Sequence, residues 1–170
     1  VVEVRDLRLV KGIEVEEGGR ALHVVVTAPP YGSSDGFDVD VAIRSDAGGG
    51  RSLVHYRCGL RLEQQLPAAF ALDLPRHDEL QLTVARAYDE LLFHGPCFQV
   101  IEAIDGVSDR GAAARVRSTR PSDWLAGPAA DQREWIFDPA LIDGAAQMAL
   151  LWARTLHGHS CLPARFARIA

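Results

Sequence analysis

The first 62 residues alternate between apolar and polar positions with the two-residue period of a β-strand. Residues 37–41 read Phe-Asp-Val-Asp-Val, and the run 54–62 sends successive side chains to opposite faces. One face is apolar and consists of Val54, Tyr56, Cys58, Leu60 and Leu62. The other face is polar and consists of His55, Arg57 and Arg61. Three glycines at 48–50 predict a hairpin turn between the two runs. The pattern therefore predicts an antiparallel meander with one polar side and no helix of its own.

The pattern changes after this meander. Residues 63–77 are rich in Gln and Pro and predict an extended linker. A helix is predicted from about residue 78 to 91, and the Gly95-Pro96 pair must then interrupt regular structure. Two further strands, 98–104 and 112–118, are expected to pair with each other across a glycine-containing turn.

The longest predicted helix begins at Pro139. Asp138 is a good N-cap, and proline suits the first helical position. Apart from Asp143 and Gln147, the residues up to Trp152 are apolar or glycine. A helix that is apolar almost all the way round is expected to be buried.

Asp143 and Gln147 are four residues apart and share one face of this helix. Burial without a basic neighbour favours the protonated form of a carboxyl group, which makes Asp143 a candidate general acid. The alternative is an ordinary core helix whose Asp143 points outward or caps a neighbouring loop. This segment alone leaves both interpretations open.

Composition narrows the class of protein. Hydrophobic residues make up 48% of the chain and the net charge is −5, which excludes a disordered chain and disfavours nucleic-acid binding. The odd number and wide spacing of Cys58, Cys97 and Cys161 favour a reducing compartment over a disulfide framework. The sequence shows neither a signal peptide nor an apolar run long enough to span a bilayer, so we expect a cytoplasmic protein without a membrane partner.

One short loop carries metal-ligand residue types. His157, His159 and Cys161 lie within five residues of one another. Three ligands on one loop with no evident fourth do not complete a zinc site, so no metal is expected.

Three stretches, in order, resemble the dehydratase domain of polyketide synthases. Residues 92–99, Leu-Phe-His-Gly-Pro-Cys-Phe-Gln, resemble the family's Tyr-Gly-Pro-x-Phe element. Residues 138–147 resemble its His-Pro-x-x-x-Asp-x-x-x-Gln helix, and Leu162-Pro163 matches a following Leu-Pro. The resemblance is greatest to the iterative enediyne and polyunsaturated-fatty-acid type.

The resemblance implies an α+β double hotdog, in which each of two long helices is wrapped by an antiparallel sheet. Residues 1–62 would be the later strands of an incomplete first hotdog that lacks its helix, and 63–77 the linker. Residues 78–170 would be the second hotdog with the Asp143 helix, its last strands lying beyond residue 170.

The resemblance also implies a lyase that eliminates water from β-hydroxyacyl thioesters. Asp143 would protonate the leaving hydroxyl, Gln147 would orient it or the carboxyl, and His94 would hydrogen-bond one of the two. The substrate-binding residues would be Gly95, Pro96 and Phe98. The substrate would be carried on the phosphopantetheine of an acyl carrier protein, without a bound cofactor. The partners would be that carrier and other domains of a multidomain synthase, with a homodimer formed through the parent protein.

The sequence departs from the family pattern in three places. His94 stands where the family has Tyr, and Asp138 where it often has His. No histidine fits the family's His-x-x-x-Gly-x-x-x-x-Pro base element, so we expect the chain to begin after the catalytic base and first helix. Two other functions remain open: a non-catalytic acyl-binding scaffold and a hotdog thioesterase.

Overall fold

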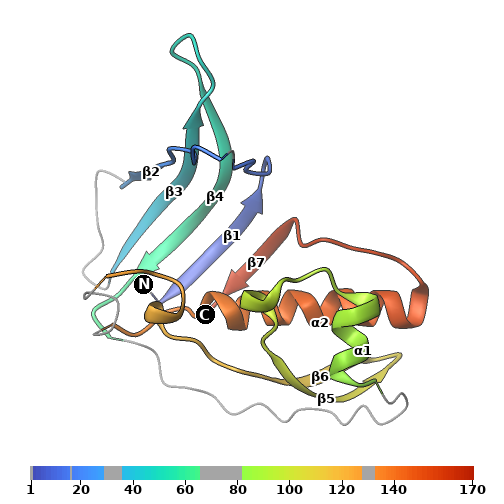
Figure 1. Ribbon diagram of the computed structural model, residues 1–170. Helices are drawn as coiled ribbons and strands as arrows, with labels where there is room; N and C mark the ends of the chain where they lie inside the picture. Colours follow the sequence, from blue (N-terminus) through green and yellow to red (C-terminus); the bar gives the residue numbers. More distant parts are fainter. Residues whose placement is uncertain (1, 16, 29–35, 66–81, 128–132) are drawn as a thin grey trace. The chain divides into compact units, whose positions relative to one another are not determined.

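The computed structural model describes residues 2–15, 17–28, 36–65, 82–127 and 133–170. They divide into two compact units, one formed by residues 1–70 with 163–170 and the other by residues 71–162 (Figure 1). The expected linker, 63–77, lies for the most part outside the described residues.

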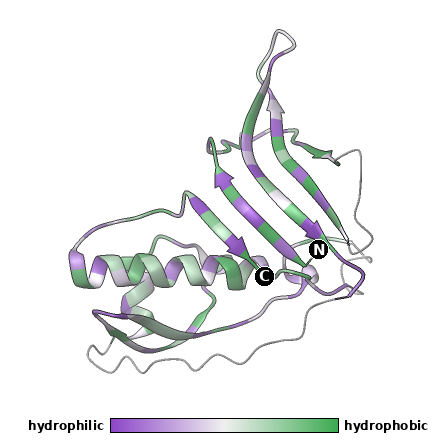
Figure 2. Ribbon diagram, turned by 180° about the vertical axis from the view of Figure 1, so that it is seen from behind, coloured by the Kyte–Doolittle hydropathy of each residue, from purple (hydrophilic) through white to green (hydrophobic). Residues whose placement is uncertain are grey.

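The first unit is a five-stranded antiparallel sheet in the order β2-β3-β4-β1-β7 (Figure 1). Its strands are β1 (Glu3–Leu9), β2 (His23–Thr27), β3 (Phe37–Asp46), β4 (Ser52–Leu62) and β7 (Arg165–Ile169). The predicted meander and hairpin are confirmed: β3 pairs with β4, and Gly48, Gly49 and Gly50 all have positive φ in the turn. Figure 2 shows hydrophobic and hydrophilic residues alternating along these strands.

A β-bulge changes the predicted face of one residue. Ile43 pairs with Tyr56 and Arg44 pairs with Val54, so His55 is the extra residue on β4. The prediction that His55 lies on the polar face with Arg57 was wrong, because His55 is only 1% exposed while Arg57 is exposed.

The C-terminal strand pairs with the first strand. Val4 lies opposite Ile169 and Leu7 opposite Phe166, so β7 extends the sheet of the first unit at β1. Arg165 hydrogen-bonds Asp6 across this pairing. Residues 163–170 therefore belong to the first unit, not to the unit of the Asp143 helix as the sequence suggested.

The second unit combines one long helix with a two-stranded sheet. Helix α2 spans Pro139–His157, and β5 (Ile101–Ser108) pairs with β6 (Gly111–Val116). Four short turns complete it: α1 (Val84–Arg86), the π turn η1 (Ala87–Leu91), and the 3-10 turns η2 (Pro96–Phe98) and η3 (Pro121–Asp123). Of the helix predicted over 78–91, the part from 84 to 91 is helical, residues 82 and 83 are not, and residues 78–81 lie outside the described residues. The first strand begins at Ile101 instead of 98 because Pro96 initiates a 3-10 turn.

Helix α2 begins as the sequence predicts. The Asp138 side chain accepts a hydrogen bond from the Ala140 N–H, and Gly158 ends the helix in the left-handed conformation. Its buried residues form one stripe, namely Ala140, Gly144, Gln147, Leu150 and Leu151. The prediction that α2 is buried all round was wrong, because Leu141 is 43% exposed and Leu156 is 38% exposed.

The core of the second unit joins this stripe to the short turns and the sheet. Its buried members are Leu82, Ala87, Leu92, Ile101, Leu150 and Leu151. Helix α2 lies close to β6 at Gly144, where an added Cβ would be 2.8 Å from Val116 Cγ1. This contact leaves no room for a larger side chain next to Asp143.

Candidate active site

Asp143 lies on α2, one helical turn before Gln147, at the border of the buried stripe. The Gln147 amide nitrogen donates to Asp143 Oδ2 over 2.7 Å. The Asp143 side chain is 30% exposed, so the expectation of a fully buried carboxylate was wrong. The reason is that only one face of α2 is buried, and Asp143 lies next to this face but does not belong to it. The carboxylate keeps access to a ligand.

Gln147 is the most enclosed residue of the site, with 1% of its surface exposed. Its amide nitrogen also donates to the Phe98 carbonyl oxygen over 2.8 Å. Its Oε1 accepts a hydrogen bond from the Tyr88 hydroxyl over 2.9 Å. The side chain therefore uses its donors and its acceptor and holds one oxygen of Asp143 in place.

His94 approaches the same carboxylate from the loop before η2. Its Nε2 lies 3.6 Å from Asp143 Oδ2, and its side chain is 12% exposed. The ring stacks on Phe93 with centroids 4.4 Å apart. Its Nδ1 is buried and has no hydrogen-bond partner among the described residues. His94 thus retains hydrogen-bonding capacity beside the carboxylate.

The Gly-Pro turn contributes unequally to the site. The Phe98 carbonyl binds Gln147, and the Phe98 ring meets Trp124 edge-on with centroids 4.7 Å apart. Gly95 and Pro96 are exposed at the start of the turn, and the Gly95 carbonyl accepts from the Phe98 N–H. The structure therefore brings Asp143, Gln147, His94 and Phe98 together, while Gly95 and Pro96 shape the turn that presents Phe98.

Sequence reasoning missed Tyr88. Its hydroxyl accepts from the Ile101 N–H over 3.0 Å and donates to Gln147. Burial, and more weakly the negative charge of Asp143, raises the pKa of Tyr88 above its ordinary value, against the opposing effect of backbone hydrogen bonds. The available signal was a tyrosine within an otherwise apolar helical stripe, where the hydroxyl needs a partner.

Asp138 is held differently from Asp143. It accepts from the Thr119 N–H, the Thr119 hydroxyl and the Ala140 N–H. Burial acts to raise the pKa of Asp138, but these hydrogen bonds outweigh it and leave the pKa below its ordinary value. Asp138 is therefore a helix cap, as predicted from the sequence, and its lowered pKa favours the ionised form.

The buried histidine of the first unit, His55, has partners on both ring nitrogens. Its Nε2 lies 2.8 Å from Ser45 Oγ, and its Nδ1 lies 3.1 Å from the carbonyl oxygens of Lys11 and of Gly12. Carbonyls only accept, so Nδ1 carries a proton. With both nitrogens engaged, His55 joins the bulge to the segment after β1 and has no free atom for catalysis.

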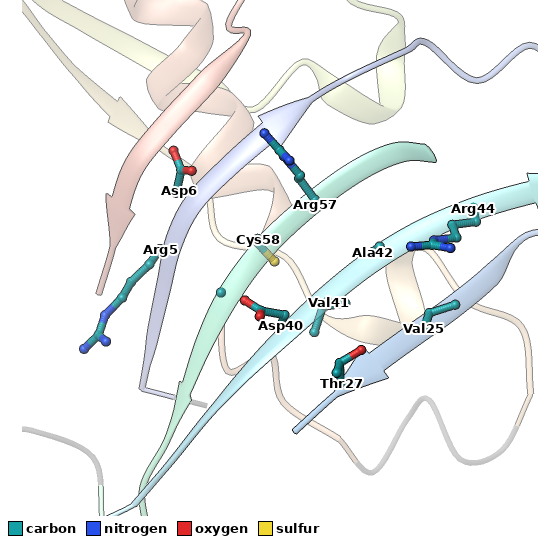
Figure 3. A pocket seen from close by; sticks show the side chains of 11 residues that line it. Arg5, Asp6, Val25, Thr27, Asp40, Val41, Ala42, Arg44, Arg57 and Cys58 are labelled. Carbon is teal, nitrogen blue, oxygen red and sulfur yellow. The ribbon is translucent and has the colours of Figure 1, made fainter. Parts of the chain in front are cut away.

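The first unit also carries a shallow hollow of about 550 Å³ on one face of its sheet (Figure 3). Arg5, Arg44 and Arg57 line it together with Asp40 and Cys58. Burial, and then the charge of Asp40, raises the pKa of the Cys58 thiol, so the thiol stays protonated near neutral pH. None of the residues predicted for the site lines this hollow.

Two further expectations from the sequence concern membrane-spanning helices and metal-binding side chains. Among the described ranges, no helix is long and apolar enough to cross a membrane. Within the same ranges, no three or more His, Cys, Asp or Glu side chains are grouped so that they could hold a metal ion, and this includes His157, His159 and Cys161.

A long capped helix packed on an antiparallel sheet is the arrangement of a hotdog-type protein, and here a carboxylate and a histidine lie next to each other at the border of the buried stripe of the helix. The sequence model of the family described as "Polyketide synthase dehydratase N-terminal domain" matches residues 71–170. The chain therefore belongs to the polyketide synthase dehydratase family, as its motifs suggested.

Similar proteins agree with this assignment. A large polyunsaturated fatty acid synthase polypeptide of a Thraustochytrium species is 27% identical over 169 residues, which cover 98% of this chain and 6% of that protein. The dehydratase domain of PpsC from Mycobacterium tuberculosis is 25% identical with a TM-score of 0.66, covering 98% of this chain and 56% of that structure. A trans-AT dehydratase domain from Brevibacillus brevis gives a TM-score of 0.74 at 18% identity, with 98% and 57% covered.

These likenesses confirm the predicted hotdog fold class. The chain spans a little over half the length of the similar dehydratase structures and a small part of the fatty acid synthase polypeptide. Another solved structure of the PpsC dehydratase domain from Mycobacterium tuberculosis is a complex with C12:1-CoA.

Proposed function

We propose that the chain forms part of a dehydratase domain that eliminates water from β-hydroxyacyl thioesters to give α,β-unsaturated thioesters. The observation that carries the proposal is the partly exposed Asp143 carboxylate, held at Oδ2 by Gln147 with His94 Nε2 3.6 Å away. The membership of residues 71–170 in the dehydratase family and the acyl-CoA complex of a similar domain support this substrate class.

The reaction breaks two bonds and forms one double bond. A base removes the α-proton, the C–O bond at the β-carbon breaks, and the electron pair of the C–H bond becomes the new π bond. Asp143 donates a proton to the departing hydroxyl, which leaves as water. The proposal assigns the base to a residue outside these 170, since no histidine of the chain carries the family's base element.

Each remaining site residue has a role in this proposal. Gln147 holds the carboxyl, and His94 binds either the carboxyl or the substrate hydroxyl through its imidazole. The exposed aromatic ring of Phe98 contacts the acyl chain, and the turn formed by Gly95 and Pro96 contacts it as well. The thioester would be presented on the phosphopantetheine of an acyl carrier protein, within a multidomain and homodimeric synthase located in the cytoplasm.

Product analysis tests the proposed reaction. The full-length protein is incubated with a β-hydroxyacyl thioester, and the products are identified by mass spectrometry. We expect an enoyl thioester that has lost one water molecule. A free acid together with a free thiol would instead identify a thioesterase, and binding of unchanged substrate would identify a scaffold; either result would refute the proposal.

A further inference from the structure

We propose that Tyr88 is a positioning residue, which fixes the orientation of the Gln147 amide and thereby directs the acid proton of Asp143 to Oδ1. This inference rests on the proposed function, because it concerns the same carboxyl group. Its first part, the direction of the hydrogen bonds, depends on geometry alone.

The Tyr88 hydroxyl has a single proton to donate. The Ile101 N–H points to the hydroxyl oxygen over 3.0 Å, so the oxygen is the acceptor in that bond. The proton is therefore available for the second partner, Gln147 Oε1, at 2.9 Å. A backbone amide that cannot reverse its polarity sets the direction of the Tyr88–Gln147 bond.

The direction of that bond fixes both ends of the Gln147 amide. With Oε1 accepting from Tyr88, the two protons on Nε2 point to the Phe98 carbonyl at 2.8 Å and to Asp143 Oδ2 at 2.7 Å. The Phe98 carbonyl accepts only, which requires the same orientation. The flipped amide would set Oε1 against both acceptor oxygens, and Gln147, at 1% exposure, is shielded from the bulk solvent that would weaken that repulsion.

The consequence falls on the two oxygens of Asp143. Oδ2 accepts a proton from Gln147 and is also the oxygen nearest to His94 Nε2, at 3.6 Å. An oxygen that already accepts such a bond is the poorer site for the carboxyl proton. When Asp143 is protonated, its proton therefore lies on Oδ1, which is the oxygen that the leaving hydroxyl must approach.

The local fold places Tyr88 for this role. Tyr88 belongs to the π turn η1, in which the Leu92 N–H bonds the Ala87 carbonyl five residues back. Ala87 is fully buried, which anchors the turn against the core of the second unit. Single π turns occur often at functional sites because they shift one side chain out of the regular helical order.

The test compares Tyr88→Phe with Tyr56→Phe in the full-length protein. Both variants lose one phenolic hydroxyl, but Tyr56 lies on β4 in the first unit and outside the proposed site. We expect Tyr88→Phe to lower kcat about five- to tenfold, the value of one hydrogen bond, with little change in KM. Tyr56→Phe should retain the wild-type kcat. An unchanged kcat in Tyr88→Phe would overturn the inference.

A double-mutant cycle separates positioning from a general structural role. If Tyr88 acts through Gln147, Tyr88→Phe should cost no further activity in a Gln147→Leu background. Equal losses in both backgrounds would show that Tyr88 acts by another route and would overturn the inference.

A spectroscopic arm is independent of turnover. The Raman difference between wild type and Tyr88→Phe isolates the Tyr88 ring modes, which report whether its hydroxyl donates, accepts or does both. We expect a hydroxyl that does both in wild type and one that only accepts in Gln147→Leu. Identical spectra would overturn the hydrogen-bond direction. If the wild-type protein forms no enoyl product while the spectra behave as expected, the proposed function fails and the geometric inference stands.

Discussion

The two units of this protein each hold a histidine that is largely withdrawn from solvent: His55 is 1% exposed, and the His94 side chain is 12% exposed. The two residues differ in their hydrogen-bond partners. His55 in the first unit contacts Ser45 Oγ through Nε2 and two carbonyl oxygens through Nδ1. His94 in the second unit has a buried Nδ1 without a partner among the described residues and an Nε2 3.6 Å from a carboxylate. The first histidine has partners on both ring nitrogens, whereas the second retains hydrogen-bonding capacity beside a carboxylate.

The same contrast separates two carboxylates on helix α2. Among the described residues, Asp138 accepts three hydrogen bonds at the N-terminus of the helix, while Asp143 accepts one, from Gln147, on a single oxygen. Buried polar groups are normally satisfied, so unused capacity in a partly open place is an indication of a ligand site. In the described part of this chain, the structural residues His55 and Asp138 have all or most of their polar atoms hydrogen-bonded, whereas His94 and Asp143 do not. This difference separates the two groups better than burial does.

The largest effect on stability should come from replacing His55, whose two ring nitrogens both have hydrogen-bond partners. His55→Ala leaves a hydroxyl and two carbonyls without their partner and opens a cavity beside the bulge, which should cost about 2–4 kcal/mol. His94→Ala should cost less than about 1 kcal/mol, because fewer bonds are lost, yet lower turnover about tenfold. Amide hydrogen exchange of each unit, followed by turnover, checks both. Equal destabilisation by the two variants would contradict the comparison.

The second largest effect concerns the packing that supports Asp143. Gly144→Ala would set its Cβ 2.8 Å from Val116 and should destabilise the second unit by about 1–3 kcal/mol. Gly95→Ala is the matched control, because nothing lies within 4 Å of its added Cβ. Local hydrogen exchange of β6 and α2 measures the difference. A Gly144→Ala protein as well protected as Gly95→Ala would mean that α2 shifts on β6 without cost.

Replacing Asp138, the carboxylate that accepts three hydrogen bonds among the described residues, should have a smaller effect on stability, and this effect should depend on pH. Replacing an N-cap Asp by Ala costs about 1 kcal/mol of helix stability. The pKa of Asp138 is lower in the folded state than in the unfolded state. The ionised carboxylate therefore stabilises the folded protein fully above the ordinary carboxyl pKa of about 4, and this stabilisation is lost as the pH falls through the lower pKa of the folded state. Exchange protection of the first turn of α2 should therefore decline in acid in wild type, but not in Asp138→Asn. A wild-type profile without that decline would show that the cap is not ionised.

The smallest effect is expected on the polar side of the first unit. Arg5 and Asp38 form an ion pair of 3.2 Å while their side chains are 49% and 54% exposed. Solvent-exposed pairs contribute little to stability. Asp38 also pairs with Arg61 over 3.1 Å, so Asp38→Asn removes both ion pairs. The variant should unfold indistinguishably from wild type, and a clear loss of protection in β3 would assign the ion pairs of Asp38 a structural role.

Local rules predicted the elements whose causes lie close together in sequence. Asp138 and Pro139 marked the start of α2, the spacing of Asp143 and Gln147 gave their contact, and the three glycines gave the β3–β4 turn. These features depend on residues within about one turn of one another.

The features that sequence reasoning missed depend on distant partners. The bulge that buries His55 follows from its register with β3, and β7 joins β1 from the other end of the chain. Tyr88 meets Gln147 across 59 residues. Periodicity also overstated the burial of α2, because alanine-rich helices look apolar on faces that remain exposed.

The most direct measurement compares the two carboxylates of α2 in the full-length protein. Asp143→Asn and Asp138→Asn make the same chemical change on one helix, and Asn caps helices about as well as Asp. We predict that Asp143→Asn lowers the rate of enoyl thioester formation at least about a hundredfold, while Asp138→Asn stays within about twofold of wild type. Retained dehydration in Asp143→Asn, or an equal loss in both variants, would contradict the assignment of Asp143 as the acid.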